Sequence, residues 1–119
     1  MTEGTLDSRV LDELRASVGG DPEFVAELID DFLDDAPRQL QTLRESATSG
    51  DAEAARRAAH TLKGNARTFG ATDFSTLCLE GETAAANRDL DAVAAQLDVI
   101  EDEWTRVRAS LEAARAASG

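Results

Sequence analysis

The sequence predicts an all-α fold, an up-and-down four-helix bundle with a short additional N-terminal helix. Apolar residues recur at helical spacing in five separate stretches, and short turns separate these stretches. No stretch shows the alternation of apolar and polar residues that is typical of a strand. Alanine is abundant and the chain has only 2 prolines, which favours helix. With 119 residues, we expect one domain over residues 1–119.

The first predicted helix spans about residues 8–18 and is the shortest of the five. Asp7 can cap its N-terminus, and the glycine pair at residues 19–20 ends it. Its apolar residues repeat at helical spacing and therefore predict one buried stripe: Val10, Leu11, Leu14 and Val18.

The second predicted helix begins at Pro22, which suits a first helical position because its missing N–H costs little there. The apolar stripe of this helix extends from Val25 to Ala47 and passes through Pro37. Since an internal proline removes one backbone hydrogen bond, we expect a kink or a break near residues 32–36.

An acidic stripe accompanies this apolar stripe, and it contains Glu27, Asp30, Asp31 and Asp34. A calcium-binding loop would need a glycine at its sixth position and a glutamate at its twelfth. Both are missing from this run, so we interpret the stripe as a solvated helix face.

The third predicted helix follows Asp51, a candidate cap, and extends to about Phe69, where Gly70 closes it. Its apolar stripe is rich in alanine, which allows close packing against neighbouring helices. The stripe contains Ala55, Ala58, Ala59, Leu62, Ala66 and Phe69.

The last two predicted helices are separated by the polar residues 87–89. The fourth begins near Thr72, a candidate cap, and Gly81 inside it should cost about 1 kcal/mol of helix propensity relative to alanine. Its apolar positions are Phe74, Leu77, Cys78, Ala84 and Ala85. The fifth has the cleanest helical period in the chain, with Val93, Leu97, Ile100, Trp104, Val107, Leu111 and Ala114.

The composition argues against several classes of function. A net charge of -12 and a pI near 4.3 disfavour a surface for nucleic acid or an anionic membrane, because both need basic residues. No apolar run approaches the roughly 18 residues that a membrane span requires. The N-terminus lacks the basic start and the apolar core of a signal peptide.

Further expectations concern the setting of the protein. The single Cys78 cannot form an internal disulfide, so we expect a reducing, cytoplasmic environment. The initial Met1 and the short C-terminal tail favour a stand-alone protein. The lack of a heptad seam outside the bundle stripes favours a monomer.

His60 is the only histidine in the chain, and the only lysine, Lys63, follows it three residues later. Because a helix turns about 100° per residue, His60 lies roughly 150° from the apolar stripe of the third predicted helix. Lys63, Arg56 and Arg67 flank it on the same outward side. These cations disfavour an imidazolium, favour a neutral nucleophilic ring and would stabilise an anion attached to it. The pattern indicates a surface site for a transferable phosphoryl group.

Gly64 lies one turn beyond His60 on the same predicted face. Glycine inside a helix costs about 1 kcal/mol relative to alanine. Its presence here is best explained if another molecule must approach the backbone closely at this point.

A short motif around His60 resembles the H-x-[LI]-K-G…G-A signature of histidine-containing phosphotransfer (HPt) domains of two-component phosphorelays. The matching residues are His60-Thr61-Leu62-Lys63-Gly64, followed by Phe69-Gly70-Ala71. The resemblance covers nearly the whole chain. It implies that His60 is the phospho-accepting nucleophile, that Lys63 lies near the phosphoryl oxygens, and that Gly64 leaves space for the partner's active site.

Other candidate site residues depend less on the resemblance. Arg67 matches no fixed residue of the family, so its role in supporting the phosphate, like the docking role of Arg56, comes from the helical wheel alone. Glu82 falls on the helix that faces the histidine helix and is a candidate hydrogen-bond partner of His60, with an idle exposed carboxylate as the alternative. Gly81 departs from the family, which usually has leucine there, and this departure concerns local helix packing.

The resemblance implies a phosphorelay intermediate. Such a protein accepts a phosphoryl group from a receiver-domain aspartate onto His60 and passes it to the aspartate of another receiver domain. The implied partners are receiver domains of response regulators or hybrid histidine kinases, which would supply the aspartate and Mg²⁺. The chain has no nucleotide-binding loop motif and no metal-ligand cluster, so we expect neither a kinase site nor a cofactor of its own.

Two alternatives remain open. One is a non-catalytic helical adaptor that docks receiver domains or other signalling proteins without carrying phosphate. The other is a metal-dependent enzyme that uses His60 with Glu82. A lone histidine provides too few nitrogen ligands for a typical zinc site, which disfavours the second alternative.

Overall fold

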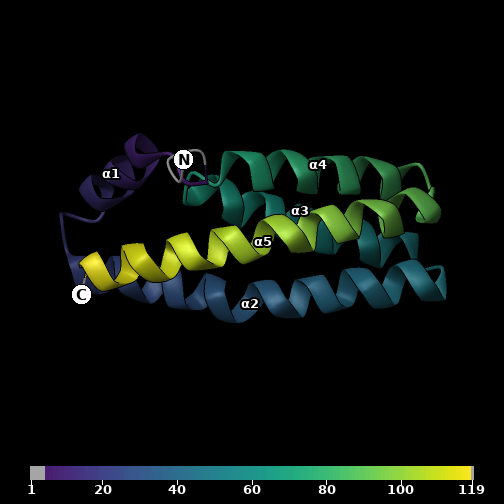
Figure 1. Ribbon diagram of the computed structural model, residues 1–119, viewed down its shortest axis with the longest axis horizontal. Helices are drawn as coiled ribbons and strands as arrows, with labels where there is room; N and C mark the ends of the chain where they lie inside the picture. Colours follow the sequence, from purple (N-terminus) through teal and green to yellow (C-terminus); the bar gives the residue numbers. More distant parts are fainter. Residues whose placement is uncertain (1–4, 119) are drawn as a thin grey trace.

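The computed structural model describes residues 5–118, and these residues form five helices (Figure 1). Residues 1–4 and 119 lie outside the described part. They include Met1, on which the expectation of a stand-alone chain depends. No strand occurs between residues 5 and 118, so the predicted all-α class is confirmed. The helices are α1 (Ser8–Ser17), α2 (Pro22–Ser49), α3 (Ala52–Thr68), α4 (Thr72–Ala86) and α5 (Leu90–Ser118).

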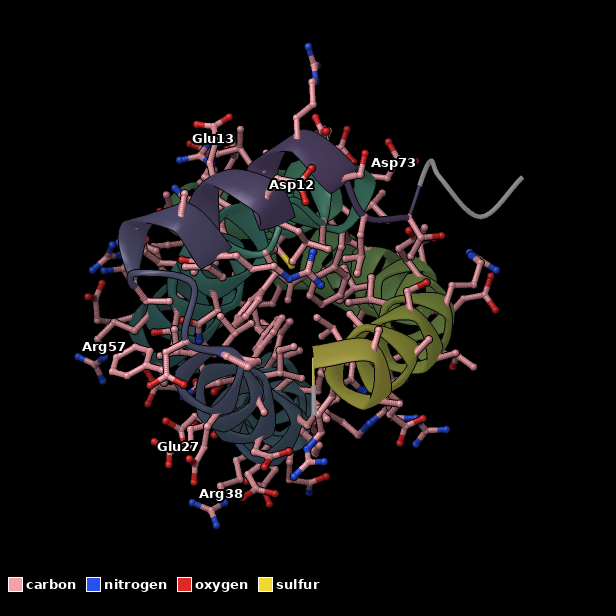
Figure 2. All side chains as sticks on the ribbon, turned by 90° about the vertical axis from the view of Figure 1, so that its left-hand side faces the viewer. Asp12, Glu13, Glu27, Arg38, Arg57 and Asp73 are labelled. Atoms are coloured by element: carbon pink, nitrogen blue, oxygen red, sulfur yellow. The ribbon has the colours of Figure 1, made fainter. Side chains whose placement is uncertain are left out.

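Helices α2 to α5 form the predicted up-and-down bundle. Helix α3 packs between α2 and α4, and α5 closes the bundle by packing against the same two helices. Short turns connect consecutive helices, which lie side by side along the long axis of the molecule (Figure 1). The short helix α1 lies across one end of the bundle, where it contacts α2 and α3 (Figure 2). Within residues 5–118, no helix is both long enough and apolar enough to cross a membrane.

The core lies between the four long helices. All six apolar residues predicted on the third helix are buried, and the alanines among them let α3 approach its neighbours closely. Four aromatic rings pack together in the part of the core beside the α3–α4 turn. The ring of Phe32 stacks on Phe69 at 5.4 Å between centroids and meets Trp104 edge-on at 5.3 Å. The ring of Phe74 packs against Trp104 at a tilt, with 5.7 Å between the centroids.

Aspartates cap the first three helices, and the caps at Asp7 and Asp51 are those that the sequence predicts. The side chains of Asp7, Asp21 and Asp51 each accept a backbone hydrogen bond in the first turn of α1, α2 and α3. The predicted cap at Thr72 is wrong, because Thr72 is already the first residue of α4. Ala71 occupies the capping position and makes no side-chain hydrogen bond to the helix.

Of the kink or break predicted near residues 32–36, the break does not occur, because helix α2 continues through Pro37. The proline ring is exposed, while Phe32, Ala36 and Leu40 on the other side of the helix are buried in the core. An internal proline costs about 3 kcal/mol. Core packing on both sides of Pro37 outweighs this cost and keeps the helix continuous.

The acidic stripe on α2 is not purely a solvated face. Arg115 of α5 binds both carboxylate oxygens of Asp30, at 2.5 Å and 3.0 Å. Glu27, Asp31 and Asp34 remain exposed. The stripe therefore contributes one link between α2 and α5 in addition to its solvated residues.

Gly81 lies at the contact between α4 and α5. A Cβ atom at this position would lie 3.3 Å from Ile100 Cδ1 and 3.8 Å from Gln96 Cγ. The glycine lets the two helices approach closely, which gives a packing reason for glycine at this position. The neighbouring Cys78 is fully buried, and burial raises the pKa of its thiol to about 12, so the thiol stays protonated at neutral pH.

Gly70 in the α3–α4 turn holds the start of α1. The backbone N–H of Asp7 donates a hydrogen bond of 2.8 Å to the Gly70 carbonyl. Gly70 has a φ of +74°, and a Cβ atom there would lie 2.9 Å from both Asp7 O and Val10 Cβ. Glycine is the residue that tolerates this backbone conformation and this close approach together.

We predict that Gly70→Ala destabilises the fold and loosens α1. Gly50→Ala is the matched control, because Gly50 also has a positive φ, +87°, but a Cβ atom there would meet nothing within 4 Å. The left-handed backbone alone costs about 1–2 kcal/mol, and the clash at Gly70 should add about 1–3 kcal/mol. Urea unfolding would measure the loss of stability in each variant, and amide hydrogen exchange would measure the protection of α1. Equal losses of stability with equal protection of α1 would contradict this account.

Candidate functional site

His60 projects outward from α3, with 61% of its side chain exposed. Its neighbours Ala59 and Leu62 are fully buried on the core side of the same helix. The outward direction agrees with the helical spacing, which places His60 opposite the apolar stripe.

Glu82 of α4 connects His60 and Lys63 across the contact between α3 and α4. Its Oε2 atom lies 2.9 Å from His60 Nδ1, and its Oε1 atom lies 2.6 Å from Lys63 Nζ. Oε1 is buried and receives no hydrogen bond of good geometry from the described residues, so the ammonium charge of Lys63 is what compensates it. One carboxylate therefore binds two of the predicted site residues.

Lys63 is less exposed than the helical wheel predicts. Only 11% of its side chain is exposed, and the ammonium group faces Glu82 instead of solvent. The wheel treats the helix in isolation and places Lys63 on the flank of α3. Helix α4 covers this flank in the folded protein, which explains the difference.

The charge state of Glu82 determines the tautomer of His60. Burial by itself would raise the pKa of the Glu82 carboxyl, but the ion pair with Lys63 and the hydrogen bond with His60 outweigh burial, so the pKa lies below its ordinary value. At neutral pH Glu82 is thus a carboxylate, which only accepts hydrogen bonds. Nδ1 of His60 must therefore carry a proton, and Nε2 of the neutral ring keeps its lone pair.

The arginines around His60 differ in their partners. Glu53 binds Arg56 at 2.5 Å and 3.1 Å and lies 4.0 Å from Arg57. The side chain of Arg67 is exposed and makes no ion pair or hydrogen bond with any residue between 5 and 118. The predicted excess of positive charge is partly neutralised, because Arg56 is paired in the same way as Lys63.

Gly64 is exposed on the same helix, one turn after His60. A Cβ atom at this position would meet nothing within 4 Å. The fold itself therefore does not require glycine here, in contrast to Gly70.

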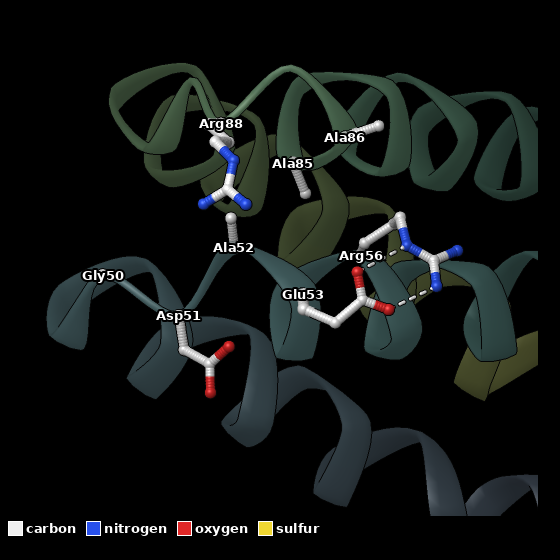
Figure 3. Close-up of a pocket in the computed structure, with 8 residues that line it drawn as sticks. All are labelled: Gly50, Asp51, Ala52, Glu53, Arg56, Ala85, Ala86 and Arg88. Atoms are coloured by element: carbon white, nitrogen blue, oxygen red, sulfur yellow. Dashed lines mark hydrogen bonds and ion pairs between the residues drawn. The ribbon is translucent and has the colours of Figure 1, made fainter.

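Two depressions flank α3, and neither contains His60. One of about 240 Å³ lies at the end of the bundle, where Arg56 is bound by Glu53 and the Arg88 side chain extends toward Ala52 (Figure 3). The other, of about 410 Å³, lies between α2 and α3 and is lined by Leu28, Asp31, Phe32, Asp35, Asn65, Thr68 and Phe69. The imidazole itself is largely exposed, so a macromolecule can reach it.

The described residues contain no group of three His, Cys, Asp or Glu side chains placed to hold a metal ion. The site thus consists of the network of His60, Glu82 and Lys63, with Arg56, Gly64 and Arg67 beside it on α3. Sequence reasoning missed Glu53, although its spacing of three residues from Arg56 is a readable signal for a helical ion pair.

Comparison with known proteins gives the class of this chain. The Hpt domain family matches residues 27–117. The crystal structure of histidine-containing phosphotransfer protein B from Pseudomonas aeruginosa PAO1 is similar with a TM-score of 0.85 and 31% sequence identity, over 95% of this chain and 96% of that chain. The chain belongs to the Hpt domain family.

More distant structures share the fold. Histidine-containing phosphotransfer protein ZmHP2 from maize has a TM-score of 0.82 at 24% identity, over 96% of this chain and 85% of that chain. The HPT domain of a hybrid histidine kinase from Shewanella has a TM-score of 0.75 at 18% identity, over 96% of each chain. At these identities the likeness concerns the helical bundle alone.

A curated relative is much longer than this chain. The sensory/regulatory protein RpfC of Xanthomonas campestris pv. campestris is 41% identical over 68 residues. The aligned region is 57% of this chain and 9% of RpfC, so the chain spans only a small part of the length of this relative.

We predict that Glu82→Gln weakens the dependence of stability on acid. The pKa of Glu82 is lower in the folded chain than in the unfolded chain, so its contribution to stability is fully present above the unfolded pKa of about 4.3. This contribution is lost as the pH falls through the folded pKa. Between about pH 6 and pH 3, the midpoint of urea unfolding should therefore fall more in the wild-type chain than in Glu82→Gln.

Glu112→Gln provides the control for net charge, because it removes an exposed carboxylate from α5, away from the site. The same acid dependence in Glu82→Gln and the wild-type chain would show that the network does not lower the pKa of Glu82.

Proposed function

We propose that this chain is a phosphorelay intermediate in which His60 accepts a phosphoryl group from a receiver-domain aspartate and passes it to the aspartate of another receiver domain. The observation that carries this proposal is the exposed imidazole whose Nδ1 is bound by Glu82, on a bundle of the Hpt family. Nε2 is then the nucleophilic atom.

The transfer needs no proton acceptor on this chain. Nε2 of His60 forms a bond to phosphorus while the bond between phosphorus and the aspartyl oxygen breaks, and the aspartate leaves as a carboxylate. Nδ1 keeps its proton, so the phosphorylated ring gains a positive charge, which the Glu82 carboxylate stabilises at 2.9 Å. In the return step the ring leaves as neutral imidazole, with the Nδ1 proton still in place.

Lys63 supports this chemistry through Glu82. The ammonium group at 2.6 Å favours the ionised carboxyl, which is the form that can accept the Nδ1 proton in a hydrogen bond and stabilise the charged ring. The ion pair also fixes the carboxylate between the two helices, so that Oε2 faces the imidazole.

Receiver domains of response regulators or hybrid histidine kinases are the proposed partners. The aspartate and Mg²⁺ would both belong to the receiver, and the metal would supply neutralisation of phosphoryl charge. This chain would bring no cofactor of its own. The bare backbone at Gly64 leaves room for a partner beside His60, and Arg56 on the same helix is a proposed docking residue.

We also place the protein in the cytoplasm as a monomer, with residues 1–119 as one domain. The single cysteine, buried as a neutral thiol, suits a reducing compartment. The apolar stripes of α2 to α5 are buried inside the bundle, which supports the proposal of a monomer.

We predict that a phosphorylated receiver domain labels the wild-type chain with an acid-labile, alkali-stable phosphoryl group, and that His60→Gln abolishes the labelling. His60 is the only histidine, so no other imidazole can replace it. Helical circular dichroism would show that the variant folds. Full labelling of His60→Gln would overturn the proposal, and receiver binding without any phosphohistidine in the wild-type chain would support a non-catalytic adaptor instead.

A further inference from the structure

We propose that Arg67 is the cation that binds the phosphoryl group on His60, and that Lys63 is a positioning residue that acts through Glu82. This assignment rests on the proposed function, because it concerns the phosphorylated state of His60. It differs from the expectation that Lys63 itself lies near the phosphoryl oxygens.

Lys63 is committed to another partner. Its side chain is 11% exposed and its ammonium group lies 2.6 Å from Glu82 Oε1. If Lys63 turned outward toward a phosphoryl group, Oε1 would remain buried without a compensating charge. Leaving a buried charge unpaired is strongly unfavourable, so the ion pair should persist after His60 is phosphorylated.

The arginines before His60 are poorly directed for this role. Side chains on a helix lean toward its N-terminus. Arg56 and Arg57 precede His60 on α3, so they lean away from it, and Glu53 already binds Arg56. Figure 2 shows Arg57 on the outer surface of the bundle.

Arg67 has the opposite geometry. It follows His60 by seven residues, at an angle around the helix that differs by only about 20°. The general lean of helical side chains directs position 67 back toward His60, across about 10 Å of helix, and Gly64 between them contributes no side chain. The side chain of Arg67 is exposed and makes no ion pair or hydrogen bond with any other residue of the described chain. Its guanidinium group offers paired N–H donors that match phosphoryl oxygens.

The test is the equilibrium distribution of a radiolabelled phosphoryl group between this chain and a receiver domain. A purified receiver domain is phosphorylated with radiolabelled acetyl phosphate, freed of the donor and mixed with each variant. The equilibrium constant depends on the stabilities of the separated phosphorylated proteins. A residue that acts only in docking changes the rates of transfer, but it leaves this constant unchanged.

The variants are Arg67→Gln, Arg67→Lys and the control Arg38→Gln. Arg38 is exposed on the outer side of α2, away from α3, so its replacement removes the same charge at a remote place (Figure 2). We expect Arg67→Gln to shift the equilibrium about fivefold toward the receiver aspartate, as suits one exposed charge pair. Arg67→Lys should recover most of the shift, Arg38→Gln should show none, and added salt should reduce the effect of Arg67→Gln.

An equilibrium constant that Arg67→Gln leaves unchanged would overturn the assignment, even if the rates of transfer fell. Equal shifts in Arg67→Gln and Arg38→Gln would overturn it as well, because they would reflect net charge alone. A wild-type chain that takes up no phosphoryl group would instead contradict the proposed function, and the assignment of Arg67 with it.

Discussion

The carboxylate of Glu82 is the group on which the whole site depends. It lies between α3 and α4, compensates the nearly buried ammonium of Lys63 and accepts a hydrogen bond from His60. The two contacts support each other, because the lysine keeps the carboxyl ionised and the ionised carboxyl fixes the proton on Nδ1. An exposed histidine side chain thereby acquires one defined tautomer and one nucleophilic nitrogen, on a surface that a partner can reach.

The packing of the bundle places this carboxylate. Small side chains on α3 allow α4 to lie close to it, and the turn at Gly70 fixes how the two helices follow each other. On the other side of α4, Gly81 allows a close approach to α5. The catalytic surface itself carries little of the stability of the fold, since His60, Gly64 and Arg67 are exposed. The outer face of α3 is therefore free to bind a partner, while its inner face packs in the core.

The helices and their buried stripes could be predicted from the sequence, because each stripe follows the helical period and each turn contains a glycine or a capping aspartate. The continuity of α2 could not, because the cost of Pro37 is offset by contacts with other helices. The outward direction of His60 follows from one helix alone and was predictable for that reason. The ion pair between Lys63 and Glu82 depends on the register between two helices, which a single sequence does not contain. The helical wheel of α3 alone therefore predicts that the Lys63 side chain faces solvent, whereas in the folded protein it forms an ion pair with Glu82.

The most direct test of this account is heteronuclear NMR of the imidazole nitrogens of His60, which is the only histidine in the chain. In the neutral ring of the wild-type chain, we predict a protonated Nδ1 and an unprotonated Nε2. Glu82→Ala, which removes the acceptor, should lose this preference. A wild-type ring protonated on Nε2 would contradict the account, because the nitrogen assigned as the nucleophile would then have no free lone pair.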